Sequence, residues 1–317
     1  MHYYIGVDGG GTKTAIVAAS RDASVFSYVK TGSASWREYG INTVVKNIKQ
    51  VIEALPFQAE DSIVGVAMGM PCYGESVDGD RKLEQALHEA FNGIPLYLSN
   101  DVEVGWAGSL GLSPGVNVVA GTGAIAYGRD EEGNSGRSGG WGEFFGDEGS
   151  CYWMGLRVME LFSKQSDGRM VRDDLYEIVR RELKLTNDTD FIDLIYSQYK
   201  HRDKVAALQL LARQAALAGS QSARALYVVA AAELCLLVRA IRDRLAFAKS
   251  PFLVSYSGGL FHAADFVFPK FTQGVEEMGG KLMQPRFEPA EGALLLAFSQ
   301  FHAEGLPRLY ARLNESK

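Results

Sequence analysis

Short apolar runs separated by glycine and polar turns begin the chain. Residues 3–7 and 25–29 are rich in aromatic and β-branched side chains, and residues 12–19 are apolar on both faces, so each run predicts a strand. Gly9, Gly10 and Gly11 stand between the first two runs, where glycine accepts the positive φ of a hairpin turn. The pattern predicts a three-stranded meander whose first turn is built of glycine.

Helices and strands alternate after this meander. We expect helices over 41–55, 81–91 and 102–110 and strands over 62–68 and 94–98. The order βββαβαβα is typical of an α/β layer. The sequence GLSPG at residues 111–115 then predicts a hinge between two domains.

The opening pattern partly recurs after the hinge. A strand over 116–120, the turn Gly121-Thr122-Gly123 and a strand over 124–127 repeat the arrangement near residue 10, which predicts two related halves with a cleft between them. A glycine-rich segment follows. The remaining elements that we expect are helices over 151–163, 173–183, 191–199, 204–218, 222–247, 266–279 and 291–302 and strands over 252–257 and 281–283.

Composition narrows the class of protein. The 317 residues suit two domains, and a net charge of −6 argues against a nucleic-acid partner. Cys72, Cys151 and Cys235 are far apart and form no CxxC pair, so we expect a reducing cytoplasm and no disulfide framework. The first residues do not resemble a signal peptide, and the apolar stretch at 225–238 is too short to cross a membrane.

The first glycine turn is a candidate phosphate site. It lacks the GxxxxGK[ST] of a P-loop, and a strand follows it rather than the helix that a dinucleotide fingerprint opens. Free backbone N–H groups and the Thr12 hydroxyl can surround phosphate oxygens, and Asp8 at the base of the turn can hold Mg²⁺. Lys13 adds positive charge unless it points into solvent. A plain hairpin turn capped by Asp8 stays open as the alternative.

Three further positions can carry chemistry. Asp101 follows a strand end, where ligands gather in α/β folds, and can take a proton from a hydroxyl; the alternative is a helix N-cap. Thr122 and Gly123 offer a second phosphate turn, with a tight structural turn as the alternative. Gly258 and Gly259 follow a buried strand and allow a base or ribose close to the backbone, or else form a strand-to-helix turn.

The glycine-rich segment holds a candidate sugar contact. Trp141 stands in a glycine loop, where an aromatic ring can lie against a sugar face or anchor the loop. Asp147 can hold ligand hydroxyls at a helix start, or can act as the N-cap of that helix.

The order of these signals resembles the superfamily of acetate and sugar kinases, actin and heat-shock chaperones. The stretches VDGGGTKT, SNDVEVGWAG, AGTGAIAYGR and GGWGEFFGDEGS resemble the BadF/BadG/BcrA/BcrD ATPase family, which includes N-acetylglucosamine kinases. The resemblance implies an α/β fold of two ribonuclease-H-like domains around an ATP cleft. It places the domains at 1–113 and 114–302, with residues 303–317 returning to the first.

The resemblance also implies roles for single residues. It assigns Asp101 as the general base and as a sugar contact. Asp8 would hold Mg²⁺, and the sugar would meet Trp141, Gly142 and Asp147. The nucleotide would meet the two glycine turns and two later glycine positions, a set comprising Asp8, Gly10, Gly11, Thr12, Lys13, Thr122, Gly123, Gly219, Gly258 and Gly259.

Two departures bear on the substrate. Mammalian-type N-acetylglucosamine kinases have Ser-Asn where this chain has Ala124-Ile125, and a sugar-binding Asn before His-Trp where this chain has the segment 33–36, SASW. Because polar pairs set discrimination, their loss changes which sugar is accepted. The catalytic residues stay, but the N-acetylglucosamine contacts do not transfer.

The sequence favours a kinase for a small sugar, with an amino sugar such as N-acetylglucosamine or glucosamine as the leading substrate. The alternative is a nucleotide-switched ATPase that acts on a protein partner. The redox activators of this family carry a cluster-ligating cysteine motif just ahead of a glycine turn, whereas this chain has Val118-Val119-Ala120 directly before Gly121, so we do not expect an iron–sulfur activator. The sequence does not choose between a monomer and a homodimer.

Overall fold

The computed structural model describes residues 1–24, 26–58, 60–248 and 250–315. Contacts divide the chain into two units, one formed by Met1–Ser113 with Gln284–Lys317 and the other by Pro114–Met283. The division after residue 113 lies where the sequence analysis places it. The return to the first unit begins at Gln284, earlier than the expected residue 303, because a whole helix of that segment packs on the first sheet.

The first sheet has five strands in the order β3-β2-β1-β4-β5. The pairs β1/β2 and β2/β3 are antiparallel and the pairs β1/β4 and β4/β5 are parallel, which confirms the predicted meander and α/β class. The expected third strand started at residue 25, which lies outside the described residues. The strands are β1 (His2–Gly9), β2 (Thr14–Ser20), β3 (Phe26–Thr31), β4 (Ser62–Met70) and β5 (Leu96–Asn100).

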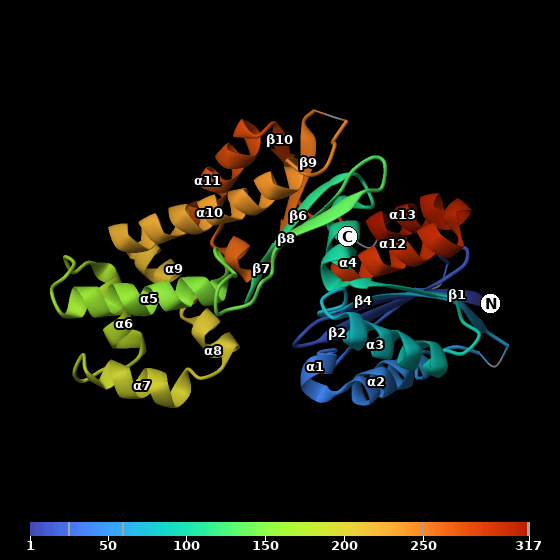
Figure 1. Ribbon diagram of the computed structural model, residues 1–317, viewed down its shortest axis with the longest axis horizontal. Coiled ribbons are helices and arrows are strands. Elements are labelled where there is room, and N and C mark those ends of the chain that lie inside the picture. The colour runs from blue at the N-terminus through green and yellow to red at the C-terminus, as the bar shows by residue number, and fades with distance from the viewer. Residues whose placement is uncertain (25, 59, 249, 316–317) are drawn as a thin grey trace. The chain divides into compact units, whose positions relative to one another are not determined.

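Helices cover both faces of this sheet, as Figure 1 shows for the blue, teal and red parts of the chain. Ile5 and Val7 of β1 join the apolar cluster under two helices, whereas Gly6 between them faces the helix on the other side. This alternation is the period of a strand buried on both faces. The helices are α2 (Ile41–Glu53) and α3 (Val77–Ala90) on one face and α4 (Asp101–Leu110) and α12 (Pro289–Phe301) on the other, with the short α1 (Trp36–Tyr39) and the terminal α13 (Leu306–Glu315) beside them.

The second sheet repeats the first. Its order β10-β9-β6-β7-β8, with β6/β7 and β7/β8 antiparallel and β6/β9 and β9/β10 parallel, reproduces the order and directions of the first sheet. The predicted repetition of strand, glycine turn and strand is therefore confirmed. Its strands are β6 (Gly115–Ala120), β7 (Ala124–Arg129), β8 (Ser135–Gly139), β9 (Phe252–Ser257) and β10 (Gly280–Leu282).

Helices of the second unit pack on one face of this sheet and extend from it (Figure 1). The helix expected over 204–218 is two helices, because a tight turn, with the Leu208 N–H donating to the Val205 carbonyl at 3.0 Å, separates them. The helices are α5 (Cys151–Ser166), α6 (Asp174–Glu182), α7 (Asp190–Gln198), α8 (Arg202–Ala207), α9 (Gln209–Ala218), α10 (Gln221–Arg242) and α11 (Ala264–Glu277). Among the described residues, no helix combines the length and apolar character that crossing a membrane requires.

Candidate active site

The glycine turn of the first unit joins β1 to β2. The Gly10 N–H donates to the Lys13 carbonyl at 2.9 Å and closes the turn. The N–H groups of Gly11, Thr12 and Lys13 donate to no other described residue, and all three residues are exposed. Consecutive N–H groups left open in this way form a concave site for an anion. The geometry of the turn therefore fits phosphate oxygens.

The segment 33–36, which departs from the mammalian-type kinases, forms hydrogen bonds to the backbone of this turn. The Ser33 hydroxyl donates to the Gly11 carbonyl at 2.7 Å, and the Ala34 N–H donates to the Gly10 carbonyl at 3.0 Å. These bonds satisfy the carbonyls of Gly10 and Gly11, whereas the N–H groups of Gly11, Thr12 and Lys13 keep no described partner. Sequence reasoning considered this segment only as a lost sugar contact and missed its role as a brace.

Asp8 and Asp101 lie on either side of Gly69. Asp8 is paired in register with Gly69 of β4, and the Asp101 Cα is 3.2 Å from the position that a Cβ on Gly69 would take. Burial and then the nearby Asp101 carboxylate raise the pKa of Asp8 to about 7, against the opposing charge of Lys13. The structure thus brings together Asp8, Asp101 and the first glycine turn at the carboxyl ends of the strands.

Asp101 is the first residue of α4 and not its N-cap. Asn100 is the cap, because its side-chain oxygen accepts from the Val102 N–H at 3.1 Å and its side-chain NH₂ donates to the Tyr73 carbonyl at 2.6 Å. The N-cap alternative for Asp101 is therefore wrong. The cap fixes the direction of the first turn of α4, and with it the backbone position of Asp101.

The glycine turn of the second unit has the same character as the first. The Gly121 N–H donates to the Gly123 carbonyl at 2.9 Å, while the N–H groups of Thr122 and Gly123 donate to no other described residue. The Cys151 N–H at the start of α5 donates to the Gly121 carbonyl at 2.8 Å. The Gly121 carbonyl is therefore hydrogen-bonded by α5, and the open N–H groups of Thr122 and Gly123 are available to an anion.

The late glycine pair lies against this second turn. A Cβ on Gly258 would stand 2.4 Å from the Ala120 carbonyl oxygen and 2.7 Å from the Gly121 nitrogen, and the φ of Gly258 is +103°. Only glycine combines this φ with so close an approach. Gly258 and Gly259 are exposed beside the turn, so the structure brings these two predicted nucleotide contacts together.

Gly219 lies elsewhere in the second unit. It ends α9 with a φ of +119°. The next helix, α10, contacts the C-terminal end of α5, where the Gln165 side chain donates to the Ser222 hydroxyl at 3.1 Å. The glycine turn touches the opposite end of α5, some 14 residues or about 21 Å away along the helix. The structure does not bring Gly219 together with the other predicted nucleotide contacts, and its geometry is that of a helix C-cap.

The glycine-rich loop places Trp141 and Asp147 in opposite environments. The Trp141 side chain is 67% exposed, so it anchors no core, and Gly142 beside it has open space around its α-carbon. Asp147 is 3% exposed and accepts the Ala124 N–H at 3.1 Å. Ser150 is the N-cap of α5, so the N-cap alternative for Asp147 is wrong.

Asp147 also pairs with a residue that sequence reasoning missed. Arg202, at the start of α8, donates from Nη2 to the Asp147 carboxylate, and its Nε is 3.6 Å from the Glu143 carboxylate. Nothing in the pattern around Arg202 marks it, because a basic residue near a helix start is common on any protein surface. Its significance depends on a contact between residues 55 positions apart.

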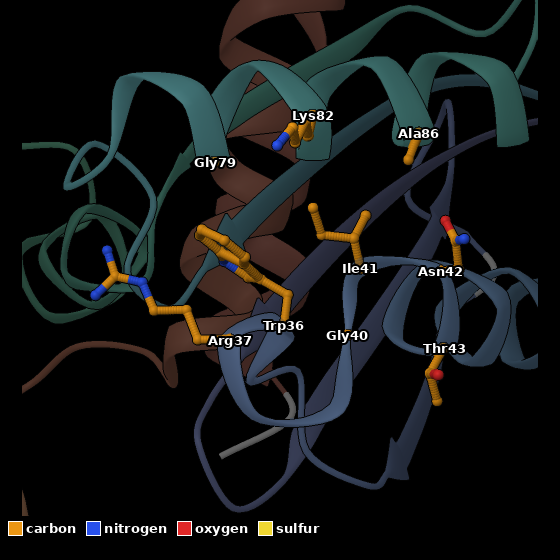
Figure 2. Close-up of a pocket in the computed structure, with 9 residues that line it drawn as sticks. All are labelled: Trp36, Arg37, Gly40, Ile41, Asn42, Thr43, Gly79, Lys82 and Ala86. Carbon is orange, nitrogen blue, oxygen red and sulfur yellow. The ribbon is translucent and has the colours of Figure 1, made fainter.

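A separate pocket of the first unit opens between α1, α2 and α3 (Figure 2). Its volume is about 600 Å³, and Trp36, Ile41 and Ala86 supply apolar surface while Arg37 and Lys82 stand on its rim. Both cations are paired, Arg37 with Glu75 at 3.3 Å and Lys82 with Asp78 at 2.7 Å. None of the predicted site residues lines it, so it is distinct from the glycine turn and the two aspartates.

Known proteins match this chain over nearly its whole length. The chain is 29% identical to an N-acetylmuramic acid/N-acetylglucosamine kinase of Clostridium acetobutylicum, over 95% of this chain and 99% of that protein. It is 28% identical to an N-acetyl-D-glucosamine kinase of Dictyostelium discoideum, over 93% of this chain and 98% of that protein.

Solved structures resemble the fold. A protein of Chromobacterium violaceum, with a proposed N-acetylglucosamine kinase assignment, superimposes with a TM-score of 0.74 at 27% identity, covering 93% of this chain and 98% of that one. A glucokinase of the ROK family from Streptomyces griseus, with a TM-score of 0.55 at 15% identity over 95% of this chain and 99% of that one, shares the fold. The sequence model of one family matches residues 5–297, and the chain therefore belongs to the BadF/BadG/BcrA/BcrD ATPase family.

Proposed function

We propose that this protein is an ATP-dependent kinase that phosphorylates a hydroxyl of a sugar, with an amino sugar such as N-acetylglucosamine or glucosamine as substrate. The observation that carries the proposal is the first glycine turn, whose open N–H groups border the pair Asp8 and Asp101. A phosphate site beside a carboxylate pair is what in-line phosphoryl transfer to an alcohol needs. The names of the relatives support the sugar as the alcohol.

Asp101 is the proposed general base. It accepts the proton of the sugar hydroxyl as the hydroxyl oxygen attacks the γ-phosphorus, and the bond from that phosphorus to ADP breaks. The N–H groups of Gly11 to Lys13 are the proposed donors of the first unit to phosphate oxygens, and those of Thr122 and Gly123 are the proposed donors of the second unit; such donors stabilise the charge that develops on a phosphate.

The nucleotide and sugar contacts follow the same reasoning. Gly11, Thr12 and Lys13 donate to the phosphates through the turn that the Gly10 N–H closes, and Gly258 and Gly259 allow the adenosine to approach the exposed backbone beside the second turn. Trp141 and Gly142 present an open aromatic surface on which a sugar ring can lie. Asp147 is the proposed polar contact of the sugar from the same loop.

The donor set around Asp8 fits a magnesium ion. Mg²⁺ binds one or two carboxylates and keeps its other positions for water and phosphate, and Asp8 with Asp101 close by offers that arrangement. The nearby Asp101 carboxylate helps to raise the pKa of Asp8, and a bound cation would lower it again. When bound, Mg²⁺ neutralises phosphate charge. We place the reaction in the cytoplasm because it consumes ATP.

A substrate screen tests the proposal. ATP consumption is measured with no acceptor and with N-acetylglucosamine, glucosamine, N-acetylmuramic acid or glucose, and mass spectrometry detects the phosphorylated sugar. We expect one sugar to stimulate ATP consumption with an equal amount of sugar phosphate. ATP hydrolysis that no sugar stimulates, without a phosphorylated product, would refute the kinase and favour a nucleotide-switched ATPase.

A further inference from the structure

An acidic cluster lies against the second glycine turn. A Cβ on Gly123 would be 3.0 Å from Oδ1 of Asp147, so the buried carboxylate touches the backbone that we propose binds phosphate. Glu143 and Glu148 flank it in the same loop. Burial raises the pKa of Asp147, and these two glutamates raise it further, while the Ala124 N–H and Arg202 lower it.

The Asp147 carboxylate would repel the phosphate that we propose binds this turn. Two negative charges a few ångströms apart in a partly buried site repel strongly, because the local dielectric is far below that of water. The phosphate-binding N–H groups of Thr122 and Gly123 can therefore act on an anion only if the charge of Asp147 is balanced from within the protein.

Arg202 supplies that balance. Its Nη2 pairs with Asp147 and would be 2.8 Å from a Cβ on Gly123, so the guanidinium reaches the carboxylate directly beside the turn. Its Nε also faces Glu143 at 3.6 Å. One cation thus contacts two of the three acidic side chains of this loop.

Helix packing fixes the position of Arg202. A Cβ on Gly155 of α5 would be 2.0 Å from the Val205 carbonyl oxygen of α8, so the two helices are in close backbone contact. The first N–H of α5 in turn donates to the Gly121 carbonyl. The turn, α5, α8 and the pair Arg202 and Asp147 form a closed ring of contacts, which holds the guanidinium at the turn.

We propose that Arg202 is a positioning residue of the phosphate-binding turn, which acts by neutralising Asp147. This inference rests on the proposed function, because it requires that the turn bind the phosphates of ATP. The chemistry that it assigns is local: with Arg202 in place the turn presents N–H groups to an anion, and without it the turn presents a carboxylate.

The test measures ATP affinity without any sugar, by isothermal titration calorimetry in buffer containing MgCl₂. We expect Arg202→Met to weaken ATP binding roughly tenfold or more, and Arg202→Lys to stay within about threefold of the wild type. Arg181→Met, an exposed arginine of α6 paired with Glu182, is the matched control and should bind ATP like the wild type. Thermal melting of each variant verifies that it is folded.

A double variant separates this role from a direct contact or a structural one. If Arg202 acts through the charge of Asp147, the double variant that combines Asp147→Asn with Arg202→Met should regain affinity for ATP. Its affinity should lie within about threefold of that of the Asp147→Asn single variant. A double variant as weak as Arg202→Met, or a folded Arg202→Met with wild-type affinity, would overturn the inference and leave the kinase proposal intact. Failure of the wild type to bind ATP would overturn both.

Discussion

At the scale of single residues, Asp8 has an unusual electrostatic environment. Its pKa is raised from 3.8 to about 7, first by burial and then by the Asp101 carboxylate. Because the folded-state pKa lies above the unfolded one, Asp8 contributes stability that is fully present below about pH 4 and is lost as the pH rises through 7. The ligand-free protein is therefore destabilised by the ionised carboxylate at neutral and alkaline pH.

We predict that Asp8→Asn stabilises the ligand-free protein at pH 8 by about 1–3 kcal/mol and that this gain shrinks toward pH 5. Urea unfolding of both proteins at several pH values between 5 and 8 measures it. Asp22→Asn is the control of opposite sign, because hydrogen bonds from Ser24 and Ser20 lower the pKa of Asp22 to about 2. That control should lose a small amount of stability that does not change between pH 5 and 8, because Asp22 is exposed and titrates below this range. A gain from Asp8→Asn that does not change with pH would contradict the argument.

Asp101 allows a second prediction at this scale. We expect Asp101→Asn to lower kcat for phosphoryl transfer by about 10²–10⁴-fold, because the amide cannot accept the hydroxyl proton, while ATP affinity changes by less than about threefold. Coupled turnover assays and calorimetry measure the two quantities. Asp78→Asn, an exposed acid of the first turn of α3, is the control and should turn over normally. Near-normal turnover of the Asp101 variant would remove the residue from its role.

The sequence could indicate the residues of the site only where they belong to a local pattern. Asp8 and the glycines stand in one turn, and Asp101 follows a strand end, so position along the chain was enough to predict them. Arg202 could not be found in this way, because its partner Asp147 is far away in sequence. The N-cap alternatives for Asp101 and Asp147 missed the actual caps, Asn100 and Ser150, by one to three residues, because Asp, Asn and Ser all make good N-caps.

At the scale of elements, α4 and α12 cross at two glycines. A Cβ on Gly292 of α12 would be 2.1 Å from the Val104 carbonyl oxygen and 2.3 Å from the Gly108 nitrogen, both in α4. A Cβ on Gly108 would in turn be 2.5 Å from the Glu288 carbonyl oxygen. The backbones of the two helices touch, and the helix that begins with Asp101 is held by this contact.

We predict that Gly292→Ala destabilises the protein by about 1–3 kcal/mol, because the new methyl group forces the two backbones apart. Alanine is the better helix former by about 1 kcal/mol, so a net loss identifies the contact as its cause. Gly32→Ala is the control, since a Cβ there would meet nothing within 4 Å. Urea unfolding compares the variants, and an unchanged or increased stability of Gly292→Ala would show that the helices separate without strain.

Most elements could be predicted because their apolar period is regular, and the exceptions have specific causes. The strand β8 has the sequence SGRSG, which contains no β-branched or aromatic residue, and it forms because it pairs with β7 at the sheet edge. The helix α12 was predicted, but the sheet on which it packs was not. Its membership of the first unit depends on Gly6, where a Cβ would be 2.2 Å from the Leu294 nitrogen, a contact that no local pattern reveals.

At the scale of the whole molecule, the two units differ in continuity. The second unit is one segment, Pro114–Met283, whereas the first needs both Met1–Ser113 and Gln284–Lys317. The late segment contributes α12, which buries apolar side chains from Ala293 to Phe298 against the first sheet and α4. The repeated strand order was predictable from the recurring glycine turns, but the point at which the chain returns was not, because it depends on which sheet α12 covers.

This asymmetry leads to a prediction about fragments. A chain that ends at Met283 should lose the folded first unit, because β1 would expose to water the face that α12 covers, and burial of apolar surface is the main source of stability. The fragment 114–283 should instead unfold cooperatively, since the apolar cluster of that unit comes entirely from its own residues. Circular dichroism melting of the fragment and hydrogen exchange of the truncated chain measure the two outcomes. Protection of β1 and β4 in the truncated chain would show that the first unit folds without α12, and the close contacts of Gly6 would then be a consequence of folding rather than a condition for it.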